Sequence, residues 1–124
     1  MKKIFTPNAP VPSGHYSQAI VHNDTVYISG LLPKEIGVQP NPCMIFEDQV
    51  KLVFQHLNEI LLASGSSPDK VLKVSVFVSD IDNWSKFDVL FKEFFGDHKP
   101  ARIVVPIKYL HFGFAIELDA IAAI

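Results

Sequence analysis

Apolar residues recur every three or four positions in two segments of the chain, which is the spacing of an amphipathic helix. The first segment begins at Phe46, and its apolar positions are Phe46, Val50, Val53, Phe54, Leu57, Ile60 and Leu61. The second covers residues 83–95, and its apolar positions are Trp84, Phe87, Leu90, Phe91 and Phe94. Gly65 and Gly96 follow the two segments, and glycine is typical just past the end of a helix. The pattern predicts two helices that each turn one apolar face toward a core.

Apolar and polar residues alternate most clearly in "VLKVSVFV", residues 71–78, which predicts a strand with one apolar and one polar face. The apolar face would carry Leu72, Val74, Val76 and Val78, and the polar face Lys73 and Ser75. Two further strands are predicted near the C-terminus, in "ARIVVPI" and "FAIELDAIAAI". Near the N-terminus, "SQAIVH" and "TVYISG" flank Asn23-Asp24, a pair that suits the turn of a β-hairpin.

The order of these elements predicts the fold class. Residues 31–45 contain three prolines and a glycine and are expected to form a surface loop. The order is then strand, strand, helix, strand, helix, strand, strand. Because helical connections can join parallel strands and short turns cannot, the sheet should be mixed. The sequence predicts one α+β domain, residues 1–124, with two helices packed on one face of the sheet.

The opposite face of this sheet is expected to mix polar and apolar side chains. The last strand would present Glu117, Asp119, Ile121 and Ala123 there, and the middle strand Val71, Lys73, Ser75 and Phe77. Such a face is too apolar to be left to water, so we expect a second copy of the chain to cover it.

Composition narrows the function classes. The chain has 124 residues, of which 48% are hydrophobic and 19% charged, as in globular domains. Its net charge is −2 and no cluster of Lys and Arg points to nucleic acid. No apolar run approaches the roughly 20 residues that span a bilayer. The single cysteine, Cys43, cannot form a disulfide within the chain, which fits a reducing compartment. Prolines follow "MKKIF" where a signal peptide would have an apolar stretch, so the sequence favours the cytoplasm.

Three charged residues in the predicted strands are candidates for chemistry. Arg102 lies in an apolar strand and needs a carboxylate partner, either on a ligand or on Glu117 or Asp119. Glu117 and Asp119 are two residues apart and so share a face of the last strand. The same pattern is expected of an edge strand whose polar face is simply exposed to water. No metal site is predicted, because Cys43 is alone and the histidines lack ligand spacing. These histidines are His15, His22, His56, His98 and His111.

Five segments give the chain a family resemblance. They are "TPNAPVPSGHYSQA", "YISGLLP", "LLASGSSPDKVLKVSVFVSDI", "FFGDHKPAR" and "IELDAIA". In this order and spacing the chain resembles the RidA (YjgF) family of reactive intermediate deaminases over nearly its whole length. The resemblance implies a chorismate-mutase-like (ferredoxin-like) subunit, a homotrimer with ligand clefts between subunits, and no cofactor.

The resemblance also assigns expected roles to residues. Arg102, in the "PAR" motif, would hold the carboxylate of the substrate, and Glu117 would position or activate the attacking water. Tyr16, Ser29 and Gly30 match cleft-lining positions of the family.

Five positions depart from the family pattern. His15 stands where proline is frequent, and Leu31 where glutamine is. Ile103 replaces a small hydroxyl residue, Val104 a cysteine found in some members, and Asp88 a frequent asparagine. Leu31, Asp88 and Val104 are expected at the cleft, which should therefore be less polar in places.

These residue types suit the hydrolysis of an imine. A 2-iminobutanoate/2-iminopropanoate deaminase would convert an enamine such as 2-aminoacrylate, through its imine, into a 2-oxo acid and ammonia. Arginine can hold the carboxylate bidentately, and a glutamate can act as general base toward water. Two alternatives are a non-catalytic protein of the same fold that binds a small carboxylate, and an RNA-acting protein. Older family names, translation inhibitor and endoribonuclease, suggest the latter, but the acidic charge balance opposes it.

Overall fold

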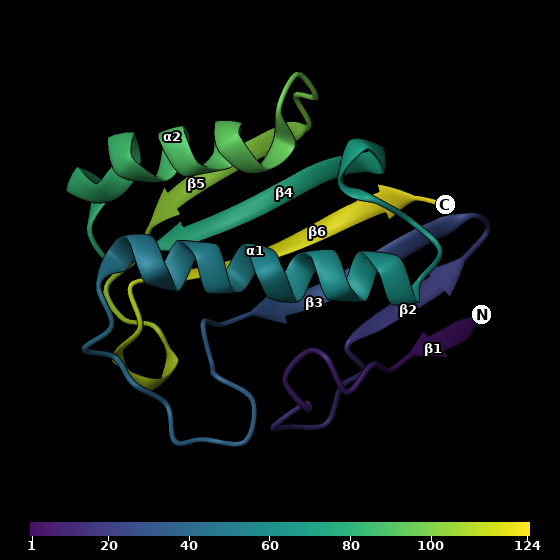
Figure 1. The fold of residues 1–124 in the computed structure, drawn as a ribbon, viewed down its shortest axis with the longest axis horizontal. Coiled ribbons are helices and arrows are strands. Elements are labelled where there is room, and N and C mark those ends of the chain that lie inside the picture. The colour runs from purple at the N-terminus through teal and green to yellow at the C-terminus, as the bar shows by residue number, and fades with distance from the viewer.

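The computed structural model describes all residues 1–124 and contains six strands and two helices (Figure 1). The strands are β1 (Lys2–Ile4), β2 (Ala19–His22), β3 (Thr25–Leu31), β4 (Val71–Val78), β5 (Ala101–Pro106) and β6 (Ile116–Ala123). The helices are α1 (Phe46–Ala63) and α2 (Trp84–Phe95). Short 3₁₀ turns lie at Pro68–Lys70, Ile81–Asn83 and His111–Gly113.

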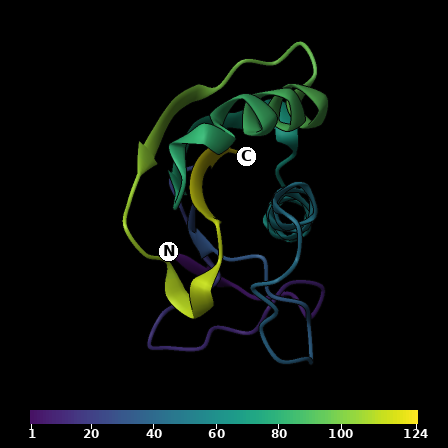
Figure 2. The same ribbon diagram turned by 90° about the vertical axis from the view of Figure 1, so that its left-hand side faces the viewer.

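The strands form one mixed sheet in the order β1-β2-β3-β6-β4-β5. β6 pairs antiparallel with both β3 and β4, while β4 and β5 are parallel and are joined through α2. Both helices lie on one face of the sheet, and Figure 2 shows α1 nearly end-on beside it. The arrangement predicted from the order of elements is therefore confirmed.

The hairpin between β2 and β3 turns at the predicted pair. Asn23 and Asp24 both have positive φ angles, 49° and 58°. Two consecutive left-handed residues are typical of a type I′ turn, whose twist matches that of the flanking strands.

The core lies between the helices and the sheet. The last strand was predicted to turn Phe114, Ile116, Leu118 and Ala120 inward, and all four are buried, as is Ala122 on the same face of β6. Phenylalanines fill the space between α1 and α2: the rings of Phe54 and Phe94 stack with centroids 4.6 Å apart. Offset and edge-on aromatic contacts of this kind add to the stabilisation from area burial.

Three details differ from the sequence prediction. Leu72 is 51% exposed and Val71 is buried, because the pairing of β4 with β6 shifts register between Val71 and Lys73. In α2 the buried face ends at Phe95, while Trp84, at the first turn, is 40% exposed. Strand β1 was not predicted, since three residues are too few to show alternation.

Candidate functional site

Glu117 lies on the sheet face that the helices leave open. It pairs with Phe77 across β4 and β6, and its neighbours Ile116 and Leu118 point into the core. Its half-buried carboxylate borders a cleft of about 500 Å³. The cleft is lined by Ser13, Gly14, Tyr16, Ser29, Gly30, Leu32, His111, Phe112 and Glu117. A carboxylate in this position can exchange a proton with a small molecule in the cleft.

Gly30 allows the main chain to approach Glu117. The pairing of β3 with β6 is irregular between Ile28 and Leu31, so Ser29 and Gly30 form a bulge. A Cβ atom at Gly30 would overlap a carboxylate oxygen of Glu117. Any other residue would therefore push the glutamate side chain out of its place, which explains glycine at this position.

The environment of Glu117 shifts its proton affinity. Burial raises the pKa of Glu117 above its usual value, and the nearby Asp119 raises it further. His111 opposes this shift of the pKa. A carboxyl group with a raised pKa is a better proton acceptor than an ordinary surface glutamate.

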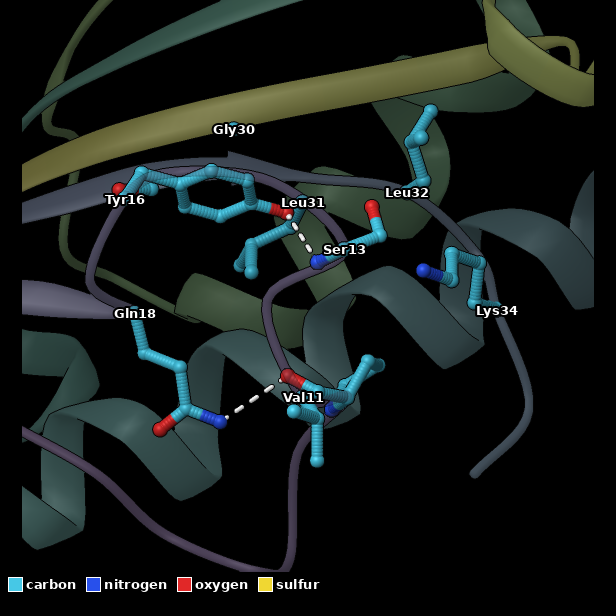
Figure 3. Close-up of a pocket in the computed structure, with 10 residues that line it drawn as sticks. Val11, Ser13, Tyr16, Gln18, Gly30, Leu31, Leu32 and Lys34 are labelled. Carbon is cyan, nitrogen blue, oxygen red and sulfur yellow. Dashed lines mark hydrogen bonds between the residues drawn. The ribbon is translucent and has the colours of Figure 1, made fainter. Parts of the chain in front are cut away.

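The rim of the cleft is held by hydrogen bonds of the N-terminal segment. The Ser13 N–H donates to the Tyr16 hydroxyl, with 3.3 Å between the heavy atoms (Figure 3). The Ser29 hydroxyl donates to the carbonyl of Ser17 over 2.6 Å. Both predicted cleft residues, Tyr16 and Ser29, thus have fixed positions. A small pocket of about 40 Å³ lies next to this rim.

Gln18 anchors the same segment and was not predicted. Its buried side chain accepts a hydrogen bond from the Thr6 N–H at 2.7 Å and donates to the carbonyl of Pro10 at 3.0 Å (Figure 3). These bonds replace the ladder that a proline-rich chain cannot make. The only sign of this role in the sequence was a glutamine directly before the apolar strand β2.

Arg102 lies on the other side of the sheet from Glu117. Arg102 pairs with the fully buried Val74 across β4 and β5, so its side chain leans toward α2. Its Nη1 donates to the Oδ1 of Asp88 over 2.7 Å. The predicted alternatives, an ion pair with Glu117 or with Asp119, are wrong because those carboxylates are on the opposite face.

Aromatic rings surround the guanidinium of Arg102. Its central carbon is 4.7 Å from the centroid of the Phe91 ring, 5.6 Å from that of Trp84 and 5.9 Å from that of Phe87. Rings at these distances favour a cation. A cavity of about 760 Å³ opens beside the group. Its lining residues are Asp88, Phe91, Lys92, Phe95, Gly96, Asp97, His98, Lys99, Pro100 and Arg102.

One chain therefore carries two separate half-sites, and it does not bring Arg102 and Glu117 together. Of the remaining residues expected at the cleft, Leu31 has its side chain in the core, and Leu32 lines the Glu117 cleft in its place. Val104 packs against the core from β5 and borders neither cavity. The sequence alone did not show on which face of the sheet each of these residues lies, because that depends on the strand register.

Comparison with known proteins identifies the family. A family model described as Endoribonuclease L-PSP matches residues 6–124. A RutC family protein from Pyrococcus horikoshii is 37% identical over 123 residues, which cover 96% of this chain and 94% of the relative. The solved structure of YyfA from Yersinia pestis, of the conserved Rid protein family, superposes with a TM-score of 0.93 at 32% identity, covering 99% and 98% of the two chains. The chain belongs to the RidA/YjgF family.

One relative in the RidA/YjgF family is named as an imine deaminase. The rat 2-iminobutanoate/2-iminopropanoate deaminase is 33% identical over 125 residues, which cover 98% of this chain and 88% of the relative. The α+β fold expected from the family resemblance, chorismate-mutase-like with two helices on one face, is confirmed.

Two further observations on this RidA/YjgF chain concern metal-binding clusters and membrane-spanning helices. No three His, Cys, Asp or Glu side chains gather in a way that would hold a metal ion. Neither helix has the length and apolar character needed to cross a membrane.

Proposed function

We propose that this protein hydrolyses reactive enamines and imines derived from amino acids, such as 2-aminoacrylate, to 2-oxo acids and ammonia. The observation that carries the proposal is the half-buried carboxylate of Glu117, whose pKa is raised. This carboxylate borders a cleft, and the absence of a side chain at Gly30 leaves room for it there. The family and the name of the rat relative support the same reaction.

Arg102 and Glu117 have complementary roles in the proposed reaction. The substrate carboxylate binds the free N–H groups of Arg102, which orients the imine carbon. A water oxygen attacks the carbon of the protonated imine while Glu117 accepts a proton from the water, which gives a neutral carbinolamine. Glu117 returns this proton to the nitrogen. The C–N bond then breaks as the carbinolamine hydroxyl gives its proton back to Glu117 and forms the C=O bond, so that ammonia leaves and the 2-oxo acid remains.

We propose that a complete site forms between two copies of the chain, in a homotrimer. Arg102 and Glu117 lie on opposite faces, so the Arg102 half-site of one copy must meet the Glu117 half-site of another. The open face is suited to such a contact because Tyr27 is 49% exposed on β3 and Ile103 is 50% exposed on the edge strand β5. Closed three-fold symmetry would give every copy the same contact.

The decisive experiment generates the enamine in place. A pyridoxal-phosphate-dependent dehydratase supplies 2-aminoacrylate, and ammonia and 2-oxo acid release are followed with and without this protein. Release should accelerate with the wild type and not with Glu117→Gln. Equal rates with and without wild-type protein would contradict the proposal.

RNA cleavage is the second candidate, because the matching family model carries the name endoribonuclease. The net charge of −2 gives phosphates no general attraction. We expect highly purified protein to leave RNA intact. RNA cleavage that persists through several purification steps and disappears in Glu117→Gln would favour this candidate instead.

A further inference from the structure

Asp88 stands directly beside the group that is proposed to bind the substrate carboxylate. Its Oδ1 accepts the 2.7 Å hydrogen bond from Nη1 of Arg102, and both residues line the same cavity. The Asp88 side chain is 46% exposed, against 21% for Arg102. A ligand that reaches Arg102 therefore also meets the carboxylate of Asp88.

The pair leaves a donor and an acceptor free side by side. Asp88 makes its hydrogen bond through Oδ1, and its Oδ2 has no partner in the protein. Nε and Nη2 of Arg102 likewise have none. These free groups match a ligand that carries an anionic acceptor next to a cationic donor.

The charges of the pair oppose a ligand that has only a carboxylate. Arg102 attracts such an anion, but the carboxylate of Asp88 repels it from a few ångströms away. A ligand with a positively charged nitrogen next to its carboxylate satisfies both groups. Lys92, Lys99, Asp97 and His98 also line the cavity, and their fields act on the carboxylate of either kind of ligand.

We propose that Asp88 makes this site selective for zwitterions, with the ligand carboxylate on Arg102 and its protonated nitrogen on the free oxygen of Asp88. The placement of the carboxylate rests on the proposed function. In that reaction the protonated iminium is the form that water attacks, and it carries both charges. The 2-oxo acid product has lost the positive nitrogen, so Asp88 also favours its release.

Two ligands with the same carbon skeleton test the proposal. L-alanine carries a carboxylate and an ammonium group, whereas pyruvate carries the carboxylate alone. Calorimetry on the assembled protein should show tighter binding of L-alanine. Asp88→Asn removes the charge and keeps a hydrogen-bonding group toward Arg102, so pyruvate should bind more tightly and L-alanine more weakly. The ratio of the two dissociation constants should change by about tenfold or more, as for a difference of 1.4 kcal/mol.

Asp97→Asn is the matched control, because Asp97 lines the same cavity and makes no hydrogen bond to Arg102. The same loss of charge there should leave the ratio unchanged. An Asp88→Asn variant that weakens both ligands equally, or changes neither, would overturn the proposal and leave Asp88 as a support for Arg102.

A measurement on the wild type alone guards against a variant that fails to fold. Lactate has the skeleton of L-alanine with a hydroxyl in place of the ammonium group. It should bind as weakly as pyruvate, and binding as tight as that of L-alanine would overturn the proposal. These binding measurements need no turnover. Tighter binding of L-alanine without imine hydrolysis would contradict the proposed function only. Imine hydrolysis with equal binding of L-alanine and pyruvate would contradict the role of Asp88 only.

Discussion

Glu117 lies on β6 in the middle of the sheet, whereas Arg102 lies on β5 at its edge. The carboxylate of Glu117 forms no salt bridge in its own chain, and burial raises its pKa. The guanidinium of Arg102 already has Asp88 and three aromatic rings around it. The central half-site, around Glu117, thus destabilises the charged form of its carboxylate. The edge half-site, around Arg102, stabilises the positive charge of its guanidinium. This difference suggests chemistry at Glu117 and recognition at Arg102.

The largest effect should come from Glu117→Gln, which keeps the shape of the side chain and removes its basicity. Turnover should fall by about 10²–10⁴-fold, the usual contribution of a general base. Binding of a product-like 2-oxo acid should change little. Ammonia release and calorimetry measure the two quantities. Equal losses in turnover and binding would argue against a catalytic role.

Arg102→Lys should lose most of the activity, because an ammonium group cannot reproduce the two parallel hydrogen bonds of a guanidinium. The fold should tolerate the change, since lysine keeps a positive charge beside Asp88. Thermal unfolding and the KM for the imine distinguish the two effects. Near wild-type turnover would remove Arg102 from the proposed site.

Mixing the two inactive variants sharpens the comparison. If each site takes Arg102 from one copy and Glu117 from another, refolding Arg102→Lys together with Glu117→Gln should restore activity to about a quarter of sites by random assembly in a closed ring. Each variant refolded alone is the control. A mixture as inactive as its parts would place both groups in a site formed by one chain.

Gly30→Ala should destabilise the central half-site alone. The added Cβ meets the Glu117 carboxylate, which ends a flexible side chain and can move aside, so the cost should be below the range of about 1–3 kcal/mol for overpacking in a core. In the Gly30→Ala, Glu117→Ala double variant the obstacle is gone, so most of this free energy of unfolding should return, although activity does not. Denaturant unfolding of the four proteins forms a double-mutant cycle. Purely additive effects would mean that the two residues do not touch.

The smallest expected effect is a pH dependence of stability. Because the pKa of Glu117 is raised in the folded state, the folded protein binds a proton more tightly than the unfolded chain does. The favourable contribution of this group is complete below its ordinary pKa, and it is lost as pH rises toward the raised value. As pH rises through the range in which Glu117 loses its proton, the free energy of unfolding of the wild type should therefore fall relative to that of Glu117→Gln. A constant difference would contradict the raised pKa.

The sequence predicted those features that depend on local periodicity. Helical spacing located α1 and α2, alternation located β6, and Asn23-Asp24 located the hairpin turn. Leu72 was predicted on the wrong face of β4. The pairing of β4 with β6 shifts register between Val71 and Lys73, and no residue in the sequence indicates such a shift.

The candidate site was predictable as a set of residues and not as a geometry. Arg102 and Glu117 follow from the family resemblance, but their separation depends on how β5, β4 and β6 align. The pair of Arg102 with Asp88 joins a strand to a helix 14 residues away in sequence, and only their packing shows it. Gln18 was missed for the same reason, since its partners are main-chain atoms of a segment without periodicity.

The bulge at Ser29 and Gly30 keeps the core side of β3 intact. Val26 and Ile28 point inward, and after the bulge Leu31 again points inward. The extra residue thus lets the main chain border the cleft beside Glu117 without turning Leu31 out of the core. One strand therefore serves the cleft and the core at the same time.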